Sequence, residues 1–112
     1  MESEFVLAAP DLLIAELGSI FREKVRSGEM FAAESATAIE VVLERVFMIP
    51  AEEAFTGALA IATSYEVSFY DALYVALAAN LHVPFVTADG KLVRNLSARY
   101  RPLLRPLWEY EA

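Results

Sequence analysis

Short apolar runs alternate with longer stretches of helical periodicity along the chain, and this alternation restricts the folds that it can adopt. Residues 46–49 form a short apolar run that is best read as a buried parallel strand, and residues 83–87 form a strand in which proline is tolerated only near the beginning. Residues 5–9 are a third apolar run, either a buried strand or an extended approach to one. Between these runs, apolar residues such as Leu13 and Leu17 recur at helical spacing. Strands that alternate with helices form a mostly parallel sheet between helix layers. We therefore predict an α/β fold of three layers.

The chain has the length of one small domain, 112 residues. It shows no internal repeat, low-complexity segment or linker, so we expect a single domain over residues 1–112. A last edge strand is expected at Leu107 and Trp108, after two prolines. The expected helices cover about residues 11–27, 31–45, 51–65, 68–81 and 89–96.

The composition excludes several classes of protein. The chain has no cysteine, so it has neither disulfides nor thiolate metal ligands. Its longest uncharged run, residues 72–88, contains Asn80, His82 and Pro84 and is too short and too polar to span a bilayer. The acidic start of the chain does not resemble the basic region of a signal peptide. We expect a cytoplasmic protein.

Glu16 lies where an amphipathic helix should be apolar. It is one helical turn from Leu13 and Ile20, on the stripe that should face the core. An ionised carboxylate in an apolar setting is costly unless it is paired or binds a cation. A polar residue at the edge of an apolar stripe is also common, so a metal ligand and a purely structural position are both open.

Asp71 stands among aromatic and aliphatic residues at the start of the fourth expected helix. Ser68 and Asp71 match the Ser-x-x-acid capping box, in which two side chains bond free amides at a helix start. The capping box explains the acid, but it does not explain the apolar surroundings. A cap and a metal ligand are therefore both open, and the two roles are compatible.

Asp89 comes directly after the apolar run at residues 83–87. Ligand sites in open α/β sheets form at the carboxyl ends of strands, where loops lead into helices. An ordinary turn is the alternative, since Asp89 and Gly90 form a common turn pair.

Glu16, Asp71 and Asp89 together suggest a metal site, because one edge of the sheet can collect all three. Converging carboxylates repel one another unless a cation neutralises them, and hard oxygen ligands favour Mg²⁺ or Mn²⁺ over Zn²⁺. Such metals activate water for phosphodiester cleavage. We expect His82 to be a surface or core-edge residue rather than a ligand. The chain lacks a Gly-rich phosphate loop, a G-x-S-x-G elbow and an H-E-x-x-H pair, so the corresponding enzyme classes fit poorly.

The charge of the chain argues against a general nucleic-acid-binding surface, because the formal net charge is −7. A nuclease can nevertheless be acidic, since bound metal ions bring positive charge to the phosphate. Lys91 and Arg94 are the candidates for contact with a nucleic-acid phosphate. They belong to a group of basic residues in the last quarter of the chain, which is either a phosphate-contacting patch or a solvated helix face: Lys91, Arg94, Arg99, Arg101 and Arg105.

Three segments resemble motifs of the VapC-like PIN-domain proteins. The stretch FYDALYVALA, which begins at Phe69, is similar to their Y-D-A-L-Y-V-A-L-A motif. The stretch FVTADGKL, which begins at Phe85, is similar to their L-V-T-A-D-x-x-L motif. The stretch APDLLIAE, which ends at Glu16, looks like their P-x-L-x-x-x-E segment. The resemblance extends to about Leu96, and the two later motifs are the more specific.

The resemblance implies a PIN-like fold and an endoribonuclease that hydrolyses RNA phosphodiester bonds. It implies that Glu16, Asp71 and Asp89 are the catalytic carboxylates and ligands of Mg²⁺ or Mn²⁺, and that Thr87 supports the site. It also implies a toxin-antitoxin system, with a cognate antitoxin and a homodimer as partners.

The sequence departs from the family pattern at its start. PIN domains normally begin with a central strand that ends in another metal-binding aspartate, and no aspartate precedes Asp11 here. A sheet without its central strand leaves buried backbone groups unpaired, at about 1–3 kcal/mol each. We therefore expect a PIN-like domain that is N-terminally incomplete, with its sheet compromised, rearranged or completed by another chain.

Two hypotheses about function follow. The first, which we favour, is a Mg²⁺-dependent ribonuclease that lacks its true N-terminus, and it predicts an in-frame upstream segment that encodes an apolar strand ending in aspartate. The alternative is a catalytically inactive PIN-like scaffold that binds an antitoxin or another partner. A receiver-like regulatory domain fits less well, because the paired acids after a first strand are missing.

Overall fold

The computed structural model describes residues 7–87, 89–96 and 98–106. It divides into two units, Met1–Pro50 and Ala51–Ala112, and each is described by itself. None of the helices among the described residues is long and apolar enough to cross a membrane.

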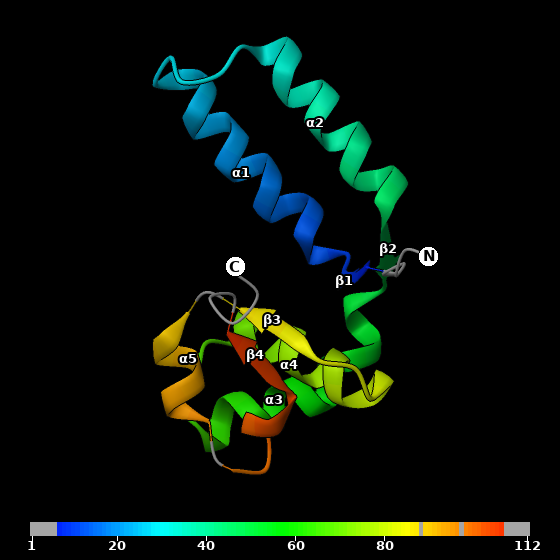
Figure 1. Ribbon diagram of the computed structural model, residues 1–112, viewed down its shortest axis with the longest axis vertical. Helices are drawn as coiled ribbons and strands as arrows, with labels where there is room; N and C mark the ends of the chain where they lie inside the picture. Colours follow the sequence, from blue (N-terminus) through cyan, green and yellow to red (C-terminus); the bar gives the residue numbers. More distant parts are fainter. Residues whose placement is uncertain (1–6, 88, 97, 107–112) are drawn as a thin grey trace, which may run out of the picture. The chain divides into compact units, whose positions relative to one another are not determined.

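The first unit is a parallel strand pair joined by a helical hairpin. It contains β1 (Leu7–Pro10), α1 (Leu12–Arg26), α2 (Ala32–Arg45) and β2 (Val46–Ile49). Leu7 lies opposite Val46 and Pro10 opposite Ile49 in the parallel register. Figure 1 shows α1 and α2 side by side, running in opposite directions. The strand predicted at residues 46–49 is confirmed, and β1 overlaps the strand predicted at residues 5–9, of which residues 5 and 6 lie outside the described ranges.

Local hydrogen bonds build the turn between α1 and α2. After α1, the Ser27 N–H donates to the carbonyl of Glu23 at 2.9 Å. Gly28 has a φ of 83°, a left-handed conformation that glycine adopts without steric cost and that commonly ends helices. The Glu34 carboxylate then accepts a hydrogen bond from the Phe31 N–H at 2.8 Å, which satisfies a free amide at the start of α2.

The apolar face of α1 is less covered than its periodicity predicts. In the described part of the first unit, neither α1 nor α2 contains a buried residue. Leu13 and Leu17 are half-buried and Ile20 is 49% exposed. Within the unit, each helix of the hairpin is covered by one other helix and by a short strand pair. These neighbours cover less of its surface than a full layer of helices would. Apolar side chains from both helices line a shallow groove between them: Ile14, Phe21, Val25 and Ile39.

The second unit packs helices against one another and carries the other strand pair. Its elements are η1 (Ala51–Ala54), α3 (Phe55–Ser64), α4 (Phe69–Leu81), β3 (Phe85–Thr87), α5 (Gly90–Asn95), η2 (Arg101–Leu103) and β4 (Leu104–Pro106). β3 and β4 are parallel, with Phe85 opposite Leu104 and Thr87 opposite Pro106. α4 contacts both α3 and β3 (Figure 1).

Small residues form much of the core of the second unit. Because alanine side chains are short, α3 and α4 approach each other closely, and a Cβ atom added to Gly57 would lie 3.5 Å from the Cβ of Ala76. α3 contributes Ala58 and Ile61 to this core. α4 contributes six buried residues: Ala72, Leu73, Val75, Ala76, Leu77 and Ala78.

All of the described strands pair in parallel, which confirms the predicted α/β class. They form two two-stranded sheets, one in each unit. The last described strand is β4 at Leu104–Pro106, and the strand predicted at Leu107 and Trp108 lies outside the described residues. A proline is tolerated there because it ends a strand at a sheet edge. The single domain over residues 1–112 and the missing central strand stay predictions.

Candidate functional site

Asp71 is positioned by the cap at the start of α4. Ser68 is the N-cap residue, and its Oγ accepts a hydrogen bond from the Asp71 N–H at 3.1 Å. The reciprocal bond of a complete capping box, from the Ser68 N–H to the Asp71 carboxylate, is not among the hydrogen bonds of the described residues. Asp71 is half-buried. The predicted cap is therefore confirmed for Ser68, whereas the Asp71 carboxylate takes no part in it.

Asp89 is the N-cap residue of α5. Its Oδ1 accepts hydrogen bonds from the N–H groups of Lys91 at 2.9 Å and Leu92 at 3.1 Å. Its own N–H donates to Thr87 Oγ1 at 3.0 Å. Thr87 is buried and Asp89 is exposed. Thr87 thus fixes the backbone of Asp89 from the end of β3, which is the contact that the predicted supporting role requires.

An aromatic contact joins the elements that carry these two acids. Phe85, the first residue of β3, stacks on Tyr74 of α4 with ring centroids 5.6 Å apart and an interplanar angle of 22°. Tyr74 follows Asp71 by about one helical turn. Asp89 follows the last residue of β3 by two positions. The structure therefore brings Asp71 and Asp89 into one unit, at the starts of α4 and α5.

Glu16 lies on α1, in the first unit, and is half-buried. Its surroundings are described within that unit only. Within either unit, the described residues include no group of three His, Asp or Glu side chains that could hold a metal ion. Of the three predicted ligands, Asp71 and Asp89 lie in the second unit, and the three-carboxylate site stays a prediction.

The structure divides the basic residues of the last quarter into two groups. The Arg101 guanidinium donates to the carbonyls of Arg94 at 3.3 Å and Leu96 at 2.9 Å, at the end of α5 where the helix dipole favours a cation. Arg105 donates to the carbonyls of Pro102 and Leu104. Both arginines therefore bond to backbone oxygens. The sequence signal that could have predicted this role for Arg101 is its position shortly after the end of a helix.

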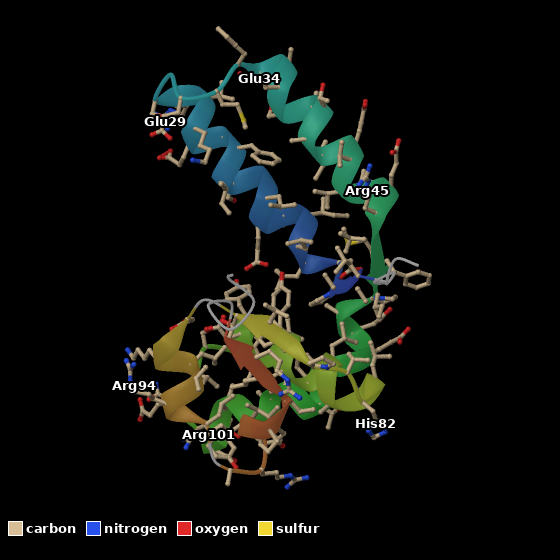
Figure 2. All side chains as sticks on the ribbon, viewed as in Figure 1. Glu29, Glu34, Arg45, His82, Arg94 and Arg101 are labelled. Atoms are coloured by element: carbon tan, nitrogen blue, oxygen red, sulfur yellow. The ribbon has the colours of Figure 1, made fainter. Side chains whose placement is uncertain are left out.

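The other basic residues differ in their surroundings. The Arg99 guanidinium lies over the Tyr100 ring, 5.4 Å from its centroid. Lys91 and Arg94 are exposed on α5, and in the described part of the chain neither side chain makes an ion pair or hydrogen bond. Figure 2 shows Arg94 pointing outward from this helix. These two cations follow Asp89 on the helix that it caps, and their exposed side chains are available to a ligand.

His82 ends α4 and is exposed to solvent. Its φ of 56° and ψ of 45° place it in the left-handed region, at the C-cap of the helix. Figure 2 shows its side chain pointing away from the body of the second unit. The prediction of a surface position for His82 is confirmed.

The sequence is similar to known proteins over most of its length. The family model described as PIN domain matches residues 1–95. Ribonuclease VapC1 of Mycobacterium tuberculosis, in the strains CDC 1551 / Oshkosh and ATCC 25618 / H37Rv, is 37% identical over 93 residues. The aligned part is 80% of this chain and 67% of the relative.

Proposed function

The chain belongs to the PIN-domain family and is a VapC-like ribonuclease, and we propose that it hydrolyses RNA with Mg²⁺ held by Glu16, Asp71 and Asp89. The state of Asp71 carries this proposal. Its carboxylate is half-buried at the start of α4, yet the cap that fixes it there uses only its backbone N–H, as far as the described residues go. A carboxylate held in this way is available to a cation.

The donor chemistry of the second unit suits a magnesium ion. Mg²⁺ prefers oxygen ligands, usually keeps several waters and takes one or two carboxylates from a protein. Asp71 offers its carboxylate, and Asp89 retains Oδ2 after Oδ1 has accepted two amides. A bound Mg²⁺ would polarise a phosphate oxygen and favour deprotonation of a water molecule. Mn²⁺ has the same ligand preference and is the second candidate.

The remaining roles fall to side chains around these acids. Thr87 orients Asp89 through the hydrogen bond between its Oγ1 and the Asp89 N–H. Lys91 and Arg94 bring positive charge to the exposed side of α5, where a phosphate of the RNA backbone would be attracted. Glu16 is assigned as the third carboxylate because it occupies the acid position of the P-x-L-x-x-x-E segment.

Family membership supports further proposals about partners and organisation. We infer a cognate antitoxin and a homodimer as protein partners, and the cytoplasm as the location of the protein. The PIN-domain match covers residues 1–95 and thus extends across the boundary between the two units. This supports a single functional domain over residues 1–112.

The proposed function is tested by RNA cleavage with the whole chain and its Asp71→Asn variant. Asparagine has the shape of aspartate and keeps the backbone N–H that Ser68 binds, so the fold should be retained. Loss of the charged ligand should lower the Mg²⁺-dependent rate about a hundredfold, which corresponds to about 3 kcal/mol of transition-state stabilisation. Glu52→Gln is the matched control, because Glu52 is an exposed acid in η1 of the same unit.

The control variant should cleave at the wild-type rate. If the wild-type chain cleaves RNA no faster with Mg²⁺ than with a chelator, the inactive PIN-like scaffold that binds an antitoxin becomes the better description.

A further inference from the structure

α5 is a short helix whose two ends are both fixed by side chains. Asp89 caps its start, and Asn95 is its last residue. The helix has six residues and is therefore only about 9 Å long. Helices of this length have little stability of their own, so the position of α5 depends on tertiary contacts: the buried side chain of Leu92 and the bonds at its two ends.

Asn95 connects the end of α5 to the segment that precedes α4. Its Nδ2 donates a hydrogen bond to the carbonyl of Glu66 at 2.9 Å, although 29 positions separate the two residues in the sequence. Glu66 lies two residues before Ser68, whose Oγ binds the Asp71 N–H. A series of hydrogen bonds and short covalent steps thus runs from Asp89, through α5, to Asp71.

A second contact holds the same segment. Tyr65, directly before Glu66, packs edge-to-face against Tyr100 with ring centroids 5.7 Å apart. The aromatic pair keeps the segment close to the residues that follow α5. The directional bond from Asn95 then fixes one particular carbonyl relative to the helix end.

We propose that Asn95 is a positioning residue, whose bond to Glu66 sets the separation of Asp71 and Asp89 and so lets both reach one metal ion. The metal-binding part of this inference rests on the proposed function. The spacing of the starts of α4 and α5 does not depend on a metal. The chemistry of the side chain supports the assignment, since the amide of asparagine supplies the N–H donor that the Glu66 carbonyl needs.

The substitution Asn95→Asp tests this role with almost no change of shape. An ionised carboxylate has only acceptors, so it repels the Glu66 carbonyl instead of bonding to it. Asn80→Asp is the matched control. Asn80 is exposed on α4, and its side chain makes no hydrogen bond within the described ranges. Asn95→Gln keeps the amide donor on a longer side chain and should therefore retain part of the positioning role that Asn95→Asp loses.

The first measurement needs neither metal nor activity. The chain has no cysteine, so cysteines introduced as Tyr70→Cys and Lys91→Cys can carry nitroxide labels next to Asp71 and Asp89. Both positions are exposed. Dipolar broadening of the spin-label spectrum should report a narrow distance distribution in the parent and in Asn80→Asp, and a broader one in Asn95→Asp. An unchanged distribution in Asn95→Asp would overturn the proposal.

The second measurement follows the metal. Asn95→Asp should require about tenfold more Mg²⁺ for half-maximal RNA cleavage, with the rate at saturating Mg²⁺ nearly retained. Mn²⁺ binding, followed by calorimetry, should weaken by a similar factor. A lower melting temperature with an unchanged Mg²⁺ requirement would reduce Asn95 to a purely structural residue and also overturn the proposal.

The two measurements separate this proposal from the proposed function. If the label distance broadens in Asn95→Asp while the parent chain neither binds Mn²⁺ nor cleaves RNA with Mg²⁺, the spacing role of Asn95 is supported and the metal-dependent function fails.

Discussion

Asp89 has a structural and a proposed chemical role, and two substitutions separate them. Its Oδ1 accepts the N–H groups of Lys91 at 2.9 Å and Leu92 at 3.1 Å, which caps α5. Asparagine at an N-cap supplies an equivalent oxygen, whereas alanine supplies none. Neither residue supplies the charged carboxylate that would bind Mg²⁺. Asp89→Asn should therefore remove only the chemical role, and Asp89→Ala should remove both.

The expected stability changes follow from the cap geometry. Replacing an N-cap side chain by alanine costs about 0.5–2 kcal/mol, and the exposure of Asp89 favours a value near 1 because water replaces part of the lost bonding. For a chain of 112 residues, about 1 kcal/mol corresponds to a fall of about 4 °C in melting temperature. Asp89→Asn loses only the interaction of its charge with the helix start, so its melting temperature should fall by less than half as much.

Thermal denaturation and RNA cleavage on the same protein preparations check both roles. Cleavage should fall about a hundredfold in both variants, since each loses the carboxylate. Equal destabilisation by asparagine and alanine would refute the view that Oδ1 holds the start of α5. Full Mg²⁺-dependent cleavage by Asp89→Asn would show that the carboxylate is not a required ligand.

Three further predictions concern packing, backbone conformation and RNA contact. Gly57→Ala should raise the free energy of unfolding by about 0.5–1 kcal/mol in urea denaturation, because the new Cβ meets the Cβ of Ala76 at an ordinary 3.5 Å and the helix loses a flexible residue. A destabilised variant would mean that α3 and α4 pack too closely at Gly57 to accept a Cβ. His82→Gly should also be stabilising, by up to about 1 kcal/mol in the same assay, because His82 has a φ of 56°, a left-handed conformation that glycine adopts at lower cost. A loss of stability would mean that the His82 side chain contributes more than the strained backbone costs. The double substitution Lys91→Gln and Arg94→Gln should weaken the salt dependence of binding to single-stranded RNA. Measured by fluorescence anisotropy, the slope of log Kd against log salt concentration should fall by about 1.4, and an unchanged slope would exclude α5 from the RNA interface.

Local signals in the sequence predict most of the elements. β2 coincides with the apolar run between Arg45 and Pro50, because the run is short and the proline ends it. Ser68 is confirmed as a helix cap because capping depends on residues three positions apart. The strand β4 (Leu104–Pro106) was not predicted, since proline usually breaks a strand, whereas Pro106 ends β4 at a sheet edge.

The candidate site depends more on contacts between distant residues and was less predictable. Charge alone cannot distinguish Arg101 from Arg94, because the partners of Arg101 are backbone carbonyls that only the folded chain brings within reach. Asn95 gives no signal in the sequence, since its partner lies 29 positions away. The two readings of Asp71, a cap or a ligand, are separated only when the cap is seen to use the backbone N–H rather than the carboxylate.

The uneven burial of the helices has a consequence for amide hydrogen exchange. α4 contributes six buried residues, whereas in the described part of the chain α1 and α2 contribute none. Openings that expose little apolar surface cost little free energy, so amides of the α1–α2 hairpin should exchange much faster than those of α4. On this reasoning the proposed ligand Asp71 lies on a slowly exchanging helix and the proposed ligand Glu16 on a rapidly exchanging one. Mg²⁺ binding should then slow exchange in both helices, because the opening of either one releases a proposed ligand.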